Sequence, residues 1–299
     1  MSDFDVNAYL LRCAALAEDF AGNVLRPERQ LPSELYSAMR YSFFAGGKRI
    51  RPALAYAAAE AVSGDGTSSI PFGVAIEMIH TYSLIHDDLP SMDDDELRRG
   101  KPTCHVKYGE AMAILAGDAL LADAFAMLTE EGMAGRYPAD TLIKCIKEIS
   151  LAAGGVGMVA GQAVDILSEG QTLDLPALEF LHTHKTGALI RASVMTGGLS
   201  AKASASELEA LGRYADRVGL AFQVADDILD VVGDTETLGK PVGSDEGLSK
   251  ATYPSVMGLA EARKRLVELI DEANEFTIPF GERGEPLRAI ATFVGSRNN

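Results

Sequence analysis

Residues 71–95 read PFGVAIEMIHTYSLIHDDLPSMDDD and join an apolar segment to a run of aspartates. Apolar side chains recur at helical spacing, and Pro71 suits a first helical turn because it has no amide hydrogen to leave unpaired. Pro90 predicts the end of this helix, which we expect over 71–88. Five aspartates follow within nine residues: Asp87, Asp88, Asp93, Asp94 and Asp95. The helix dipole disfavours negative charge at a C-terminus, so the cluster is unfavourable for stability and indicates a function.

A second aspartate motif, Asp226-Asp227-Ile228-Leu229-Asp230, lies in the stretch 218–232, whose apolar periodicity predicts a helix. Asp226 and Asp230 share one face, whereas Asp227 points about 100° away. Like charges at this spacing repel, so the pair costs stability unless a cation lies between them. Carboxylates without nearby His or Cys suit Mg²⁺, and two such groups on separate helices can hold several ions that bridge a diphosphate. A solvated acidic turn would explain either cluster alone, but the presence of both argues against it.

Cationic residues are scarce, because 27 Lys and Arg stand against 43 Asp and Glu. The stretch 46–52, GGKRIRP, places three cations within four residues before a predicted helix N-terminus, which adds partial positive charge. Other candidate anion-binding residues are Arg98, Arg99, Lys185 with Thr186, and Lys240. Each group taken alone could be ordinary solvated loop charge. A diphosphate needs such direct donors as well as metal ions.

The composition limits the function further. A net charge of -16 argues against nonspecific binding to nucleic acid or an anionic membrane. Three cysteines without a pairing pattern favour a reducing compartment. The acidic N-terminus does not resemble a secretory signal, and Asp118 and Asp123 interrupt the longest apolar stretch, 111–128, so we expect no membrane span. We therefore expect a cytoplasmic enzyme.

Helical periodicity dominates, and convincing alternating strands are absent. We expect a charged connection over 93–103 and a long functional loop over 233–253. Besides 71–88, helices are predicted over 33–44, 52–62, 109–130, 138–152, 176–196, 206–231, 254–274 and 286–297. With no repeat or linker in the sequence, the simplest prediction is one all-α domain over 1–299.

Seven segments, in this order, resemble the trans-prenyl diphosphate synthases, and within them the bacterial farnesyl diphosphate synthases. The segments are GGKRIRP, HTYSLIHDDLPSMDDDELRRG, KPTCHVKYGEAMAILAGDALL, GGVGMVAGQAVD, HTHKTGALI, GLAFQVADDILDVVGDTETLGKP and SKATYP. The similarity runs from about residue 40 to 260. It implies a multi-helix bundle of the isoprenoid synthase type around a central active-site cavity, and a homodimer.

The resemblance also implies a function for individual residues. Isopentenyl diphosphate would bind at Lys48, Arg51, His80 and Arg99. The allylic diphosphate would bind to Mg²⁺, three ions per active site, held by Asp87, Asp88, Asp93, Asp226, Asp227 and Asp230. Further charge or hydrogen bonds would come from Arg98, Lys185, Thr186, Gln223 and Lys240. Of these residues, Lys185, Thr186, Gln223, Lys240, Asp87 and Asp226 would be the catalytic ones.

The chemistry would be ionisation of the allylic C1–O bond, attack by the double bond of isopentenyl diphosphate, and loss of a proton. The product tail would extend from Asp87 back along helix 71–88, where Tyr82 and Ser83 lie about one turn, ~5.4 Å, away. Tyr82 is bulky enough to stop a tail after a few isoprene units, unless it is simply a core residue. We therefore expect farnesyl diphosphate, with geranyl and geranylgeranyl diphosphate as alternatives.

Three other functions share part of these sequence patterns. The pairs Glu77-x-x-His80 and Glu179-x-x-His182 have the spacing of a di-iron bundle, but such a site would leave both aspartate motifs unused. A terpene cyclase shares an aspartate-rich motif but binds only one diphosphate, and so would not need Lys48, Arg51 and Arg99. An acidic scaffold or Ca²⁺-binding module would leave the cations unexplained and has no EF-hand loop.

Overall fold

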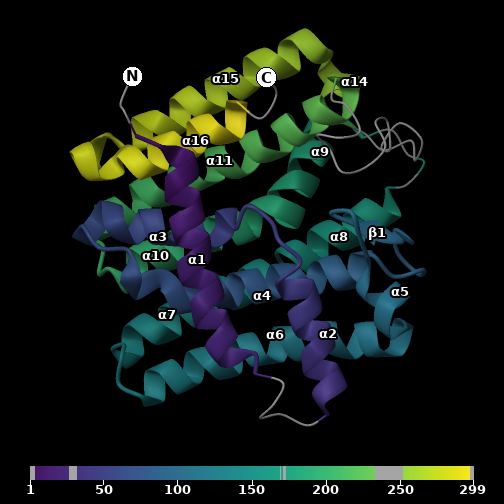
Figure 1. The fold of residues 1–299 in the computed structure, drawn as a ribbon. Coiled ribbons are helices and arrows are strands. Elements are labelled where there is room, and N and C mark those ends of the chain that lie inside the picture. The colour runs from purple at the N-terminus through teal and green to yellow at the C-terminus, as the bar shows by residue number, and fades with distance from the viewer. Residues whose placement is uncertain (1–3, 27–31, 169, 171–172, 233–251, 297–299) are drawn as a thin grey trace.

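The structure is a computed structural model that describes residues 4–26, 32–168, 170, 173–232 and 252–296 (Figure 1). Its elements are α1 (Val6–Val24), α2 (Ser33–Phe43), α3 (Ile50–Ser63), η2 (Thr67–Ser69), α4 (Ile70–Asp87), β1 (Leu97–Arg98), β2 (Lys101–Pro102), α5 (Cys104–Tyr108), α6 (Glu110–Met133), α7 (Ala139–Ala153), α8 (Met158–Leu167), α9 (Leu175–His182), η3 (Thr183–Gly187), α10 (Ala188–Ser200), α11 (Ala205–Val232), α14 (Tyr253–Met257), α15 (Leu259–Phe276), η4 (Ile278–Gly284) and α16 (Glu285–Ser296). The all-α prediction is confirmed. In the described ranges, the only sheet is the two-stranded antiparallel hairpin β1-β2.

Helix α4 lies at the centre of the bundle and positions the first aspartate motif. Almost every side chain from Pro71 to Tyr82 is buried, which is typical of a helix that is apolar on all sides. It packs along α6 and also contacts α3, α10 and α1, which crosses in front of it in Figure 1. Asp87, the last residue of α4, is therefore held at a partly buried position next to the core.

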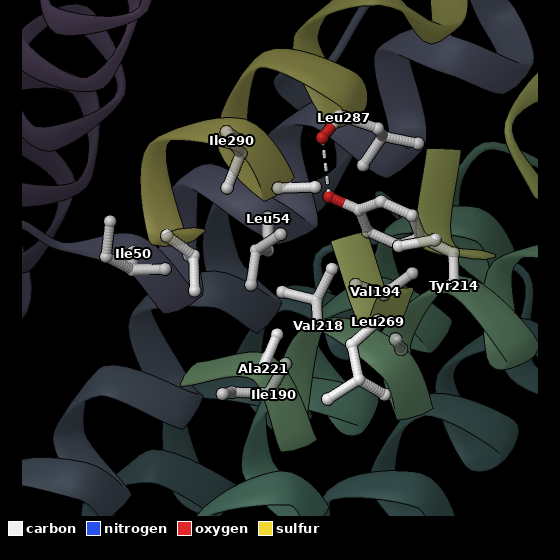
Figure 2. Packing of buried hydrophobic residues seen from close by; sticks show 14 of the residues in the cluster. Ile50, Leu54, Ile190, Val194, Tyr214, Val218, Ala221, Leu269, Leu287 and Ile290 are labelled. Atoms are coloured by element: carbon white, nitrogen blue, oxygen red, sulfur yellow. Dashed lines mark hydrogen bonds between the residues drawn. The ribbon is translucent and has the colours of Figure 1, made fainter. Parts of the chain in front are cut away.

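Small residues let α3 and α10 approach closely. Alanines make up much of the buried surface of α3, and a Cβ atom on Gly197 of α10 would lie only 2.2 Å from the carbonyl oxygen of Ala55. Beyond this contact lies one of two apolar clusters, formed by α1, α3, α10, α11, α15 and α16 (Figure 2). At its edge the buried hydroxyl of Tyr214 donates a hydrogen bond to the carbonyl oxygen of Leu287, 2.7 Å away. The second cluster joins α1, α2, α4, α6, α7 and α10.

Most predicted helices are confirmed within a few residues, but the single helix predicted over 254–274 was wrong. The stretch 176–196 is helical throughout, as α9, the π-helical turn η3 and α10 in succession. The stretch 254–274 is divided into α14 and α15 at Gly258, whose φ of 86° is left-handed and ends the first helix. The break contains a glycine, Gly258, that periodicity alone ignores.

Three helices were not predicted from the sequence: α1, α5 and α8. The expected connection 93–103 contains the hairpin β1-β2, whose turn uses left-handed backbone at Arg99 and Gly100. Most of the expected loop 233–253, with Lys240, lies outside the described residues.

Two helical stretches are long and apolar enough to cross a membrane by length and composition alone, Glu110–Met133 and Ala139–Leu167. The second consists of α7 and α8 with a break between them. A helix in the core of a protein meets the same criterion, and α6 packs along α4. The expectation of no membrane span stays a prediction.

Candidate active site

A cavity of about 380 Å³ lies beside the C-terminal half of α4 and faces α8 and η3. Its lining residues are Arg51, His80, Tyr82, Ser83, Leu84, His86, Asp87, Met92, Met158, Val159, Gln162, Ala163, Ile166, Lys185 and Thr186. Seven of these residues were predicted from the sequence: Arg51, His80, Tyr82, Ser83, Asp87, Lys185 and Thr186. Charged and polar groups thus share one cavity with apolar side chains, as an amphiphilic ligand would require.

Asp87 and Asp93 of the first motif lie close together, because the chain turns sharply after α4. The amide of Asp93 donates a hydrogen bond to the carbonyl oxygen of Asp87, 2.9 Å away. Burial raises the pKa of Asp87 to about 6. The cation Lys185 opposes this shift, and the neighbouring carboxylate of Asp93 adds to it. An ionised carboxylate that is largely buried beside a second carboxylate destabilises the protein unless a cation lies next to it, so these two residues fit a Mg²⁺ site.

Asp88 points away from Asp87 and pairs with Arg98. The Nε atom of Arg98 donates to Oδ1 of Asp88 at 2.7 Å, and Asp88 is only 3% exposed. Both residues line a separate small recess on the other side of α4 rather than the large cavity. The structure therefore does not bring Asp88 and Arg98 to the cavity with Asp87, although the sequence grouped all three.

Arg99 of the hairpin packs against the two glycines of GGKRIRP. The guanidinium of Arg99 donates to the carbonyl oxygen of Gly46, and a Cβ atom on Gly47 would lie 2.6 Å from its Nη1 atom. Gly47 also has a φ of 125°, which side chains disfavour. The two arginine groups that the sequence singled out, 46–52 and 98–99, are therefore brought into contact.

Arg51 and His80 lie together at one end of the cavity, where Arg51 supplies the positive charge. Burial lowers the pKa of Arg51, and Arg99 adds to this effect, whereas Glu77 and Asp226 oppose it. The buried Nε atom of Arg51 has no hydrogen-bond partner in the described structure. Burial and nearby arginines lower the pKa of His80 well below its usual value, so its imidazole is neutral. An anionic ligand would supply the missing partner for Arg51.

Lys48 lies nearby but faces the C-terminal helix. Its Nζ atom lies 5.0 Å from the ring centroid of Phe293 on α16, a cation–π contact. Lys48 is exposed and is not among the residues that line the cavity. Of the predicted isopentenyl site, the structure thus places Arg51 and His80 in the cavity and Lys48 against Phe293. Arg99 lines the recess that holds Arg98, yet lies close enough to Arg51 to lower its pKa.

The π-helical turn η3 presents Lys185 and Thr186 to the cavity. A Cβ atom on Gly161 of α8 would lie 2.2 Å from the amide nitrogen of Lys185, and one on Gly219 of α11 would lie 3.1 Å from Cα of Gly187. The turn therefore fits between two helices because both lack a side chain there. Rare π-helical turns of this kind often occur at functional sites.

Asp227 of the second motif takes part in a buried polar network. Its Oδ2 atom accepts a hydrogen bond of 2.8 Å from the amide of Tyr253 and lies 3.3 Å from Nε2 of His182, without hydrogen-bond alignment. Gln223 lies 3.0 Å from the other ring nitrogen of His182. Neither Gln223 nor any of Asp226, Asp227 and Asp230 lines the cavity as the structure describes it. Asp226 nevertheless lies close enough to raise the pKa of Arg51.

Within the described residues, no three His, Cys, Asp or Glu side chains are grouped closely enough to hold a metal ion. The di-iron alternative also loses Glu77, which is paired with Arg49 at 2.9 Å. The acidic residues near the cavity offer only carboxylate oxygen, the donor that Mg²⁺ prefers. Lys240, a predicted catalytic residue, lies outside the described residues.

Three polar residues around the site were not predicted to belong to it, although His182 was named for the di-iron alternative and Arg49 lies in the cationic stretch 46–52. Asp165 of α8 accepts a hydrogen bond from Lys185, and His182 links Gln223 to Asp227. Arg49 is 3% exposed, in left-handed backbone, and pairs with Glu77 and with Glu18 of α1. The available signal was that each residue lies inside a segment that carries the resemblance, Arg49 in GGKRIRP, Asp165 in GGVGMVAGQAVD and His182 in HTHKTGALI.

Comparison with known proteins gives one consistent family. The family model described as "Polyprenyl synthetase" matches residues 32–277. The chain is 49% identical over 268 residues to a farnesyl diphosphate synthase of Geobacillus stearothermophilus, which covers 90% of this chain and 90% of that protein. It is 44% identical over 299 residues to a geranylgeranyl diphosphate synthase of Cyanophora paradoxa, covering 100% of this chain and 98% of that protein.

The fold is also that of a solved structure, the apo form of an FPP/GFPP synthase from Zymomonas mobilis. The TM-score is 0.85 at 36% identity, and the match covers 98% of this chain and 100% of that chain. Relatives that carry different product names therefore share the fold and most of the length of this chain.

Proposed function

This chain belongs to the polyprenyl synthetase family, and from that premise we propose that it condenses an allylic diphosphate with isopentenyl diphosphate to give farnesyl diphosphate. The family supports the prenyltransferase activity itself. The observation that carries the proposal is the cavity, in which Arg51, Lys185 and Asp87 share one space with Tyr82 and Ile166. A prenyl diphosphate has this mixed character, with an anionic head and an apolar tail.

The cations would hold the two diphosphates at separate positions. Arg51, with Arg99 and Lys48 beside the cavity, would bind isopentenyl diphosphate, and the neutral imidazole of His80 would hydrogen bond to it. Lys185 and Thr186 would bind the allylic diphosphate. Mg²⁺, when held by Asp87, Asp93 and Asp226, would neutralise charge on the departing diphosphate.

The reaction would then proceed in three steps. The allylic C1–O bond breaks with the electron pair leaving on diphosphate, while Lys185 offsets the new negative charge. The double bond of isopentenyl diphosphate attacks the carbocation, because both substrates are held close. A proton leaves the adduct for the released diphosphate, which acts as the base, so neither a side-chain base nor a side-chain nucleophile is needed. The buried side chain of Met158 would help to exclude the water that could quench the cation.

Farnesyl diphosphate is the proposed product because Tyr82 reaches the cavity. It is 8% exposed, lies one turn before His86, and contacts its ring. Ser83 next to it is small and also lines the cavity. Relatives bear both farnesyl and geranylgeranyl names, so the product is decided by experiment rather than by family.

The test is incubation of the protein with isopentenyl and dimethylallyl diphosphates and Mg²⁺, followed by chromatography of the dephosphorylated products. We expect farnesol as the main product and none in the presence of a chelator. Absence of any elongated product would refute the proposed function. Turnover of the allylic diphosphate alone would favour a terpene cyclase, and a main product of geranylgeraniol would refute only the assignment of Tyr82.

We further propose a cytoplasmic homodimer. The cytoplasmic location rests on the composition and the dimer on the family resemblance. Exposed apolar side chains on α6 and α7, such as Leu115 and Ile143, support a contact between two copies. Sedimentation equilibrium would measure the mass, and a monomer at micromolar concentration would contradict the dimer.

A further inference from the structure

His86 is a cavity residue that none of the proposed steps uses. It precedes Asp87 on α4 and lines the same cavity, but its ring lies over Gly117 of α6. Its Nε2 atom lies 3.1 Å from the carbonyl oxygen of Ile114, one helical turn before that glycine. The imidazole therefore covers a position on α6 where there is no side chain.

The fit between this ring and α6 is tight. A Cβ atom on Gly117 would lie 2.2 Å from Nε2 and 2.6 Å from Cδ2 of His86, far inside van der Waals contact. The ring can occupy its place only because residue 117 is glycine. Any side chain there would move the imidazole away from α6.

His86 and Tyr82 together separate the cavity from α6. Their ring centroids lie 5.6 Å apart at an interplanar angle of 78°, an edge-to-face contact one helical turn apart. Among the described residues that line the cavity, none belongs to α6, although α6 packs along α4. The two rings are therefore the wall of the cavity on this side.

We propose that His86, held against Gly117, determines product length together with Tyr82. This inference rests on the proposed condensation, because it concerns the space left for the growing prenyl tail. Loss of the imidazole would open the space over Gly117 and admit a longer tail. A side chain at 117 would push the imidazole toward the tail and shorten it. Both changes alter the contact between His86 and residue 117, and the proposal predicts that they shift product length in opposite directions.

The experiment compares His86→Ala, Gly117→Ala and the double variant with the wild type. The control is Gly132→Ala on the same helix, where a Cβ atom would meet mainly one terminal methyl of Leu142 and no cavity residue. Products from dimethylallyl and isopentenyl diphosphates are separated by chain length, and circular dichroism checks that each variant is folded.

We expect His86→Ala to shift the main product up by one isoprene unit and Gly117→Ala to raise the share of geranyl product several-fold. In the double variant the shortening should disappear, because the ring that collides is gone. Gly132→Ala should keep the wild-type distribution. If Gly117→Ala fails to fold, the distribution made by His86→Ala alone decides.

Two failures are distinguishable. A wild-type protein that makes no elongated product would refute the proposed function and remove the basis of this inference. A wild-type protein that elongates normally, with the same product distribution in His86→Ala, would overturn the inference and leave the proposed function standing. A shortening by Gly117→Ala that persists without the imidazole would also overturn it.

Discussion

The Nζ atom of Lys185 lies 2.6 Å from the Oδ2 atom of Asp165, so a lysine that faces the cavity from η3 is held by a carboxylate of α8. Both side chains are mostly buried, with 26% and 16% of their surface exposed. The pair fixes the direction of the ammonium group before any substrate binds. Preorganised charge of this kind lowers the barrier to ionisation more than mobile charge does.

This contact gives the first prediction. Asp165→Ala should lower kcat with dimethylallyl diphosphate by about 10- to 100-fold, because a misplaced Lys185 no longer meets the leaving diphosphate. Asp165→Asn keeps an acceptor oxygen and should lose less. Steady-state kinetics of both variants would measure the difference. Equal losses of kcat would show that the acceptor oxygen kept by asparagine does not help to position Lys185.

The second prediction concerns the packing of η3 against α8. Gly161→Ala should reduce turnover by about 100-fold, because the new methyl group would displace the backbone of Lys185. Helix content should be retained. The matched control is Gly22→Ala in α1, where no atom lies within 4 Å of the new Cβ and where alanine should stabilise the helix by about 0.5 to 1 kcal/mol. Wild-type turnover in Gly161→Ala would contradict the close packing of α8 on η3.

The third prediction links Asp87 to stability. Its pKa of about 6 exceeds the ordinary 3.8, so the folded protein binds more protons than the unfolded chain between these values. Stability from this group therefore falls as pH rises from about 4 to 6 and stays low above that range. Without Mg²⁺ at pH 7, Asp87→Asn should raise the free energy of unfolding by ~1–2 kcal/mol, allowing for partial exposure.

Urea unfolding at pH 7 and pH 4 would check the Asp87 prediction. The advantage of Asp87→Asn should largely disappear at the lower pH, where the wild-type carboxyl is protonated in the folded state and partly protonated in the unfolded chain. Saturating Mg²⁺ with a diphosphate should reverse the order, because only the wild type keeps the full set of ligands. An equal or lower stability of the variant at pH 7 would contradict the prediction.

The fourth prediction concerns Arg49, which is paired with buried Glu77 at 2.9 Å. Arg49→Met should lower the free energy of unfolding by about 3 kcal/mol or more, because it leaves Glu77 buried without its cation. The double variant Arg49→Met with Glu77→Leu should recover much of the loss, since neither charge then remains. Thermal unfolding of the single and double variants would test this, and additive losses would refute the coupling.

The sequence predicted what depends on spacing and composition. Helical periodicity located α4 and α11, and the scarcity of cations singled out Arg51, Arg99 and Lys185, which the structure gathers at or beside the cavity. The divided helix at η3 was not predictable in the same way. Its π-helical turn depends on Gly161 and Gly219 of two other helices, so no local signal specifies it.

The direction in which individual side chains point could likewise not be predicted from helical periodicity. Asp87 and Asp88 are neighbours in the sequence, yet one faces the cavity and the other pairs with Arg98. That choice depends on how the turn after α4 places the hairpin. The contact between His86 and Gly117 depends on the register of α4 against α6, which is a property of the packed bundle.

The close approach of α3 and α10 has a consequence for how such a chain can diverge. At Gly197 even one added methyl group would meet the backbone of Ala55, so this part of the scaffold tolerates almost no substitution. The cavity wall is built from separate side chains that can change singly while the scaffold stays intact. Evolution therefore has few accessible routes to a different fold and many to a different product.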